Sequence, residues 1–182
     1  YDESRQMVFG NVNSIARGDS SGWTRSASLE QGLRVPVGSM LLQPYGALQY
    51  IYVRQNSFTE SGAGTLNQEV GGIDTHSFRG ILGSRLSRAW QLDSGRVLVP
   101  ELRAAWMHEF LEPTSTVNAV FAPIGGGSFA ARGLNFGRDW ALLGTGAQFV
   151  LSQQVSLFAN YDLQLNSRQT SHAGSGGLQF LW

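Results

Sequence analysis

The sequence ends in Ala173-Gly-Ser-Gly-Gly-Leu-Gln-Phe-Leu-Trp182, and this stretch decides how the rest of the chain is interpreted. In an extended strand alternate residues share a face, so Leu178, Phe180 and Trp182 lie together on one side. The ends of water-soluble domains usually fray into solvent, and an apolar strand that finishes on Trp is unusual there. In a transmembrane β-barrel lipid covers the outward face, and an aromatic residue suits the interface.

Composition narrows the possible classes of protein. The 182 residues are enough for one domain, and charged residues make up only 14%, against about 25% in typical soluble domains. The net charge of zero gives no basic field for nucleic acid, and the absence of cysteine excludes disulfides and thiol ligands. No apolar run reaches the roughly 18 residues that a membrane-spanning helix needs. We therefore expect either a soluble β-protein or a membrane β-barrel.

Hydrophobic residues alternate with polar ones along most of the chain, which predicts strands and no helix. The alternation is clearest between Val155 and Asn166 and least clear between Met7 and Arg17. The expected strands number eight and cover residues 7–17, 23–35, 42–52, 77–90, 98–110, 141–151, 155–166 and 173–182. Most are longer than the five or six residues usual in soluble sheets.

The connections between these strands alternate in length. Tight turns are expected after the second, fourth and sixth strands, as at Gly38-Ser39, and long polar connections at 59–74 and 111–136. Residues 17–22 read as a further turn on the long-connection side. This pattern predicts an antiparallel up-and-down barrel with short turns at one end and long loops at the other. Both termini are expected at the short-turn end, which is periplasmic in outer-membrane barrels.

Each expected strand has one apolar and one polar face, as in a membrane barrel. This alternation alone does not exclude a soluble sandwich, in which the apolar faces point inward. Strand length and aromatic residues near strand ends favour the barrel; these are Trp23, Trp90, Trp106, Phe110 and Trp182. The barrel interpretation turns one set of charged side chains toward the lumen: Glu30, Arg34, Arg79, Arg85, Glu101, Arg103, Glu109 and Asp162. They either pair across strands and fill the interior, or line a polar path that holds a traversing segment.

Segments along nearly the whole chain resemble the translocator β-domain of type V autotransporters. They include Leu42-Gln-Pro-Tyr-Gly-Ala-Leu-Gln-Tyr50, Phe58-Thr-Glu-Ser-Gly-Ala-Gly64, Leu82-Gly-Ser-Arg85 and Pro100-Glu-Leu-Arg-Ala-Ala-Trp-Met-His-Glu-Phe110. Further matches begin at Phe121, Arg138 and His172. The end of the chain also resembles the assembly signal of bacterial outer-membrane barrels, with Ser175, Gly177, Phe180 and Trp182 at the signal positions.

The resemblance implies a twelve-stranded outer-membrane barrel that anchors an N-terminal passenger and takes part in its export. Residues 1–182 match the last eight strands as a single barrel domain, without the passenger, the pore helix, the first four strands or the Asn-Asn cleavage linker of self-cleaving members. The implied partners are outer-membrane lipid and lipopolysaccharide, the barrel-assembly machinery and the chain's own passenger. The implied state is a monomer that needs no cofactor and binds no nucleic acid.

Enzymatic signatures are weak. The histidines His76, His108 and His172 fall on separate strands or loop ends, and the sequence has no nucleophile elbow or zinc-binding His pair. Gly144-x-Gly146 precedes no helix pattern, so these glycines fit a bend or close strand packing better than a nucleotide site. Arg17-Gly18-Asp19 matches a cell-adhesion tripeptide, but matches of three residues arise readily by chance.

Three hypotheses remain. The first is an autotransporter translocator and anchor; the second is a free-standing small outer-membrane barrel with a structural or adhesive role; the third is an outer-membrane enzyme. An eight-stranded interior is just filled by side chains, so eight strands that close alone would leave no export pore. Residues 7–17, or a strand outside this sequence, must pair with the last strand to remove the open edges.

Overall fold

The computed structural model describes residues 2–92, 95–111, 116–121, 128–133 and 135–181. The chain forms two compact units. The first unit comprises Tyr1–Ala27, Tyr50–Ser77 and Leu111–Asn135; the second comprises Ser28–Gln49, Phe78–Phe110 and Phe136–Trp182. The expectation of one domain over residues 1–182 stays a prediction.

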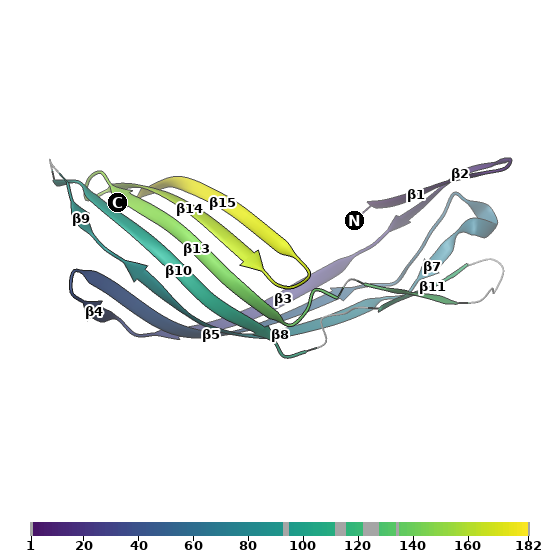
Figure 1. The fold of residues 1–182 in the computed structure, drawn as a ribbon. Helices are drawn as coiled ribbons and strands as arrows, with labels where there is room; N and C mark the ends of the chain where they lie inside the picture. Colours follow the sequence, from purple (N-terminus) through teal and green to yellow (C-terminus); the bar gives the residue numbers. More distant parts are fainter. Residues whose placement is uncertain (1, 93–94, 112–115, 122–127, 134, 182) are drawn as a thin grey trace. The chain divides into compact units, whose positions relative to one another are not determined.

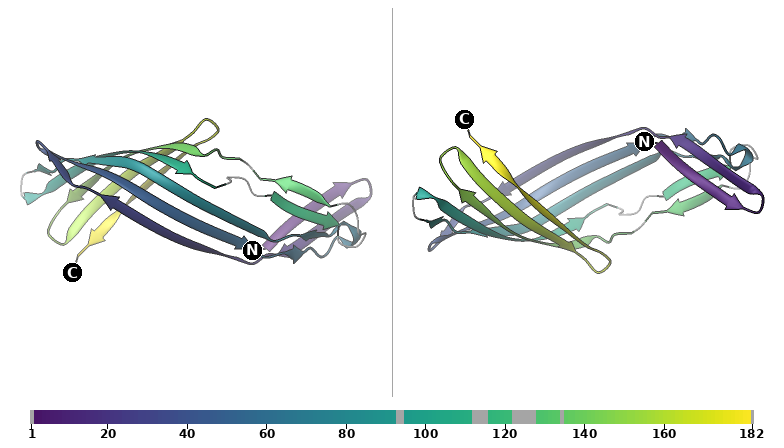
Figure 2. Two further views of the ribbon diagram at one scale, coloured as in Figure 1. Left: turned by 90° about the horizontal axis from the view of Figure 1, so that it is seen from below. Right: turned by 90° about the horizontal axis from the view of Figure 1, so that it is seen from above.

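Seven long strands follow one another as an antiparallel meander (Figure 1). They are β3 (Gly22–Gly32), β5 (Met40–Gln55), β8 (Ile73–Ser87), β10 (Val97–Glu109), β13 (Asp139–Val150), β14 (Val155–Leu165) and β15 (Thr170–Phe180). Each has 11 to 16 residues, and about 9–11 suffice to cross a bilayer. In the second unit this sheet is strongly curled (Figure 2). The predicted antiparallel all-β meander is confirmed for these seven strands.

The predicted first strand is wrong. Residues 7–17 do not form one strand, because a two-residue turn at Gly10 and Asn11 folds them into a hairpin of β1 (Asp2–Phe9) and β2 (Val12–Asp19). Gly10 has φ of +54°, a conformation that a glycine adopts without steric cost. A Gly-Asn pair between two alternating runs is a hairpin signal, and it was present in the sequence.

The turn predicted at residues 17–22 is also wrong. Arg17 lies within β2 and exchanges two backbone hydrogen bonds of 2.8 Å with Ser61. The Asn56 N–H donates to the Ser21 carbonyl at 2.8 Å, so the backbone stays paired between β2 and β3. Gly18 is buried, and a side chain there would collide with the Phe58 ring. The Arg17-Gly18-Asp19 tripeptide is thus part of a paired strand rather than an exposed loop.

The two long connections contain strands of their own. In the first unit, β6 (Phe58–Thr59), β7 (Gln68–Val70), β11 (Thr116–Phe121) and β12 (Phe129–Arg132) form a four-stranded sheet in the order β12-β11-β7-β6. The 3-10 helix η1 (Gly64–Leu66) precedes β7. The polar and Gly-rich composition of these segments predicts loops, and it hides the short strands that they form.

Two prolines interrupt the ladder near the short turns. The Leu33 N–H donates to the Pro44 carbonyl at 3.0 Å, but Pro44 has no N–H to return, and here β3 gives way to β4 (Val35–Val37). Arg88 and Pro100 repeat the arrangement at 3.3 Å, between β8 and β9 (Trp90–Gln91). The interruptions explain why two predicted strands, 23–35 and 77–90, each appear in two pieces.

Two of the three short connections, at Gly38-Ser39 and at residues 152–154, behave as predicted, and residues 93 and 94 of the third lie outside the described residues. Val37 pairs with Met40 across the Gly38-Ser39 turn, and Gly38 has φ of +61°. In the short turn that precedes β14, the Gln154 carbonyl accepts a hydrogen bond from the Leu181 N–H at 2.9 Å. The described backbone of the C-terminal strand is therefore tied to the neighbouring turn, while Trp182 lies outside the described residues. In the part of the chain that the structure describes, no helix is long and apolar enough to cross a membrane.

Candidate functional site

The curled sheet of the second unit has one apolar face, and strand register builds it. One row runs from Leu82 through Trp106 and Ala141 to Leu165, each paired with the next across a strand boundary. A second row joins Leu98, Phe149, Leu157 and Leu178 in the same way. Since side chains alternate between faces, these pairings collect the apolar residues of five strands on one side.

This apolar face is exposed rather than packed. Leu82, Leu102 and Leu178 expose 61%, 60% and 59% of their surface. Among the described residues no large side chain is completely buried, so no conventional hydrophobic core is present there. A soluble protein rarely leaves so extended an apolar surface in water, and hydrocarbon is the solvent that such a surface fits.

The opposite face carries the charged residues singled out above. Arg85 of β8 donates from Nη1 and Nη2 to the two carboxylate oxygens of Glu30 on β3, both at 2.8 Å. Strand β5 lies between them in the sheet, and the Arg85 guanidinium sits 4.1 Å from the ring centroid of Tyr45 on that strand. The pair therefore bridges across a whole strand, with an aromatic ring beneath the cation.

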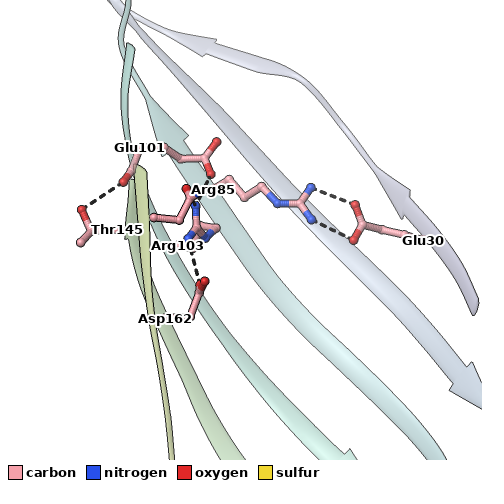
Figure 3. Close-up of polar contacts among 7 residues, drawn as sticks. Glu30, Arg85, Glu101, Arg103, Thr145 and Asp162 are labelled. Carbon is pink, nitrogen blue, oxygen red and sulfur yellow. Dashed lines mark hydrogen bonds and ion pairs between the residues drawn. The ribbon is translucent and has the colours of Figure 1, made fainter. Parts of the chain in front are cut away.

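A second cluster centres on Arg103 of β10. Its guanidinium donates to Glu101 and to Asp162 of β14, both at 2.9 Å (Figure 3). It also donates to Asn160 at 3.3 Å. Strand β13 separates β10 from β14, and Gly144 leaves the room for this contact. A Cβ on Gly144 would lie 2.7 Å from the Asp162 Oδ1 and 2.8 Å from the Arg103 Nε. The sequence predicted a bend or close strand packing at this glycine, and the structure places the Arg103 and Asp162 side chains against it.

A third pair joins Arg79 and Glu109, with Nε donating to the carboxylate at 3.0 Å. Glu109 is only 5% exposed, and it also accepts from the Phe78 N–H at 2.8 Å. Arg34 differs from the other seven residues of the set. It is exposed between β3 and β4 and forms no ion pair with any described residue.

Tyr45 and Asn160 belong to these clusters as well, and neither was predicted as a site residue. Both fall on the polar side of their strands by the period of two, so the pattern placed them correctly. Nothing in a single sequence, however, says which neighbouring strand a long arginine will reach across. That information depends on register and on the empty position at Gly144.

The histidines have local partners and form no common centre. His76 contacts the Tyr50 hydroxyl at 2.7 Å, His108 contacts Asp139 at 2.8 Å, and His172 contacts the Tyr161 hydroxyl at 3.4 Å. Within the described ranges, no group of three or more His, Cys, Asp or Glu side chains could hold a metal ion. The structure brings together ion pairs suited to a polar lining, and the histidines stand apart from them.

Comparison with protein families identifies the chain. The family model for the autotransporter β-domain matches residues 1–162. The chain belongs to the autotransporter β-domain family. Outer membrane protein A of Rickettsia conorii (strain ATCC VR-613 / Malish 7) is similar, with 24% identity over 182 residues, 95% of this chain. The chain spans only 9% of that relative's length.

An autotransporter β-domain is the outer-membrane translocator of a type V secreted protein, and it is integral to the bacterial outer membrane. The apolar and charged faces described above suit that location. The family is a translocator family and not a catalytic one, and its members carry a passenger of their own. The predicted family, fold class and function are confirmed, and the translocator hypothesis prevails over the free-standing barrel and the enzyme.

Proposed function

We propose that this autotransporter β-domain works as a monomeric closed barrel whose apolar face meets lipid and whose charged face lines the lumen. The observation that carries the proposal is the separation of faces by register. Exposed leucines lie on one side of the sheet, and the ion pairs of Arg79, Arg85 and Arg103 lie on the other. In lipid the charged side must face inward, because an Arg or Lys side chain exposed to the hydrocarbon costs about 2–4 kcal/mol.

The lumen-lining set in this proposal is Glu30, Arg34, Arg79, Arg85, Glu101, Arg103, Glu109 and Asp162. Seven of them form ion pairs with one another, which supports a preorganised polar wall rather than mobile single charges. Such a wall hydrogen-bonds poorly to a passing segment unless the pairs open. We propose that the paired residues shape the lumen and that Arg34, which forms no ion pair with a described residue, contacts the passenger.

The sheet needs further strands to close. Its described path ends at β15 on one side and at β3 on the other, and open edges in a bilayer leave backbone groups without partners. We propose that strands outside this sequence fill the gap between these edges, as the larger barrel of the family implies. The barrel would then be wide enough for export, which an interior of eight strands is not.

We propose that the short turns and the C-terminus are periplasmic. For the N-terminal end the hairpin changes the expectation, because it adds a reversal. Asp2 pairs with Asp19, which lies just before the first residue of β3, Gly22. This end of β3 is the one on the side of the long connections. In this proposal Asp2 therefore lies, like Asp19, at the outer end of β3.

The assembly signal in this proposal consists of Ser175, Gly177, Phe180 and Trp182. Phe180 is 59% exposed on the apolar face of the edge strand β15, where the barrel-assembly machinery could bind it before closure. Gly177 packs under the Phe158 ring, since a Cβ there would lie 2.9 Å from the Phe158 Cζ. Because β15 is at the edge of the described sheet and Phe180 is exposed on it, both are accessible to a binding partner, which supports this role.

Export of the passenger tests the function. In the full natural polypeptide, Phe180→Ala combined with Trp182→Ala should lower the outer-membrane level of the protein at least fivefold. External protease digestion should show a matching loss of surface passenger. Gln179→Ala is the matched control, because Gln179 pairs with Ser156 on the opposite face, and it should leave both levels unchanged. Normal display in the Phe180/Trp182 variant would contradict the proposed signal.

A further inference from the structure

The apolar face of the second unit is hollowed by a groove of about 410 Å³. Its lining crosses strands β3, β5, β8 and β10 and includes Leu29, Leu48, Leu82, Trp106 and Phe110. The volume falls within the roughly 300–1,000 Å³ typical of small-molecule pockets. Every strand contributes apolar side chains, so an apolar occupant is the one that fits.

Gly46 opens the groove, and a second glycine, Gly80, lies under the Phe110 ring. Both lie on the apolar face, and at Gly46 a side chain would fill part of the groove. A Cβ on Gly46 would make ordinary contact, 3.4 Å from the Leu82 Cδ2. A Cβ on Gly80 would lie 2.9 Å from the Phe110 Cε2, so that position is already tight. The groove therefore has glycine at its floor and leucine and aromatic walls.

We infer that the groove holds an acyl chain of an outer-leaflet lipopolysaccharide molecule, an inference that rests on the proposed orientation of the barrel. The groove is continuous with the apolar face that meets lipid, so its occupant comes from the bilayer. An unfilled hollow would forfeit dispersion contacts on all its walls. A flexible hydrocarbon chain fills it without burying a polar group.

The position of the groove along the strands indicates which membrane leaflet supplies the lipid. The groove reaches His108 and Phe110 at the end of β10 that leads into the long connection of residues 111–136. That end is the outer one in the proposed orientation. There Asp139 accepts one hydrogen bond from Trp106 Nε1 at 3.0 Å and contacts His108 Nδ1 at 2.8 Å. Polar groups at this end of an apolar groove suit a lipid whose headgroup lies toward the cell exterior.

Lipid retention tests the assignment. The full natural polypeptide is purified from outer membranes in mild detergent, and 3-hydroxy fatty acids, which mark lipopolysaccharide, are measured per protein. Gly46→Leu should fill the groove and reduce retention at least threefold. Gly174→Leu is the matched control, because Gly174 lies on the same face with nothing within 4 Å of an added Cβ. Equal retention in Gly46→Leu and wild type would overturn the inference, as would a Gly46-dependent loss of phospholipid fatty acids alone.

A second measurement does not depend on filling the groove. The sequence contains no cysteine. An introduced cysteine, Leu82→Cys or Leu157→Cys, is therefore the one site within it that a benzophenone maleimide labels in intact outer membranes. The Leu82 probe should crosslink lipopolysaccharide at least threefold more than the Leu157 probe on the same face. Equal crosslinking from the two positions would contradict a specific site. Absence of lipid crosslinks from both would instead contradict the proposed lipid-facing side.

Discussion

The carboxylate of Glu30 on β3 and the guanidinium of Arg85 on β8 meet through two hydrogen bonds of 2.8 Å across the intervening strand β5. Sheet neighbours usually pair with the adjacent strand, and here the ion pair reaches one strand further over the Tyr45 ring. A contact of this span holds three strands at fixed separation and curvature. It is thus a candidate determinant of how tightly the sheet curls.

A double-mutant cycle measures this pair. Glu30→Gln and Arg85→Gln should each lower the free energy of unfolding, with a coupling of about 0.5–1 kcal/mol, because both side chains are partly exposed. The measurement is urea unfolding of the full natural polypeptide in detergent micelles. Exchanging the charges, as Glu30→Arg with Arg85→Glu, should recover part of the loss. Additive single mutants would show that the pair contributes nothing.

Gly144 should not tolerate a side chain. In Gly144→Val the new atoms would displace Arg103 or Asp162, and overpacking of this kind costs about 1–3 kcal/mol. Gly174→Val provides the comparison, since it adds the same side chain to open space on the other face. Heat modifiability on gels, which reports the folded barrel, should be lost at lower temperature only in Gly144→Val. Equal behaviour of the two variants would contradict the crowded geometry around Arg103.

The first unit should weaken in acid through Glu60. Burial alone would raise the pKa of Glu60, but hydrogen bonds from Arg5 and from the Gln68 N–H outweigh it and lower this pKa below its ordinary value. A lowered folded-state pKa means that the contribution is complete above the ordinary value of about 4.3 and is lost as the pH falls below it. At neutral pH the interaction should contribute about 1–2 kcal/mol.

Hydrogen exchange checks this prediction in the hairpin of β1 and β2. Amide protection in the wild type should decline as the pH falls below about 4.3, after correction for intrinsic exchange. Glu60→Gln should show lower protection at neutral pH and no such acid-dependent step. An acid step of the same size in Glu60→Gln would assign the effect to another group.

How far the sequence predicts the fold depends on the length scale of the signal. Alternation over ten residues located β14 and β15 because each side of a membrane strand has a distinct solvent. It failed at Gly10, where a two-residue turn lies inside a run that looked continuous, and at Gly18, where a glycine packs against Phe58 instead of turning the chain. Glycine marks both turns and close packing, and a single sequence does not distinguish them.

The sequence predicted which face of the sheet carries the charged residues but not which of them form ion pairs. The period of two placed Glu30, Arg85 and Arg103 on one side, as observed. Which charges meet depends on register and on strands that are not neighbours in sequence, such as β3 with β8. The groove was not predicted at all, because it arises where Gly46 leaves space beside residues of adjacent strands.

Accessibility along β14 tests the central claim most directly. Single cysteines at positions 155–165 of the full natural polypeptide, spin-labelled in liposomes, report exposure to oxygen in lipid and to a nickel chelate in water. Oxygen accessibility should peak at Leu157, Ala159 and Leu163, and chelate accessibility at Phe158, Asn160 and Gln164, with a period of two. The opposite phase, or no period of two, would contradict an apolar face in lipid and a charged face toward the lumen.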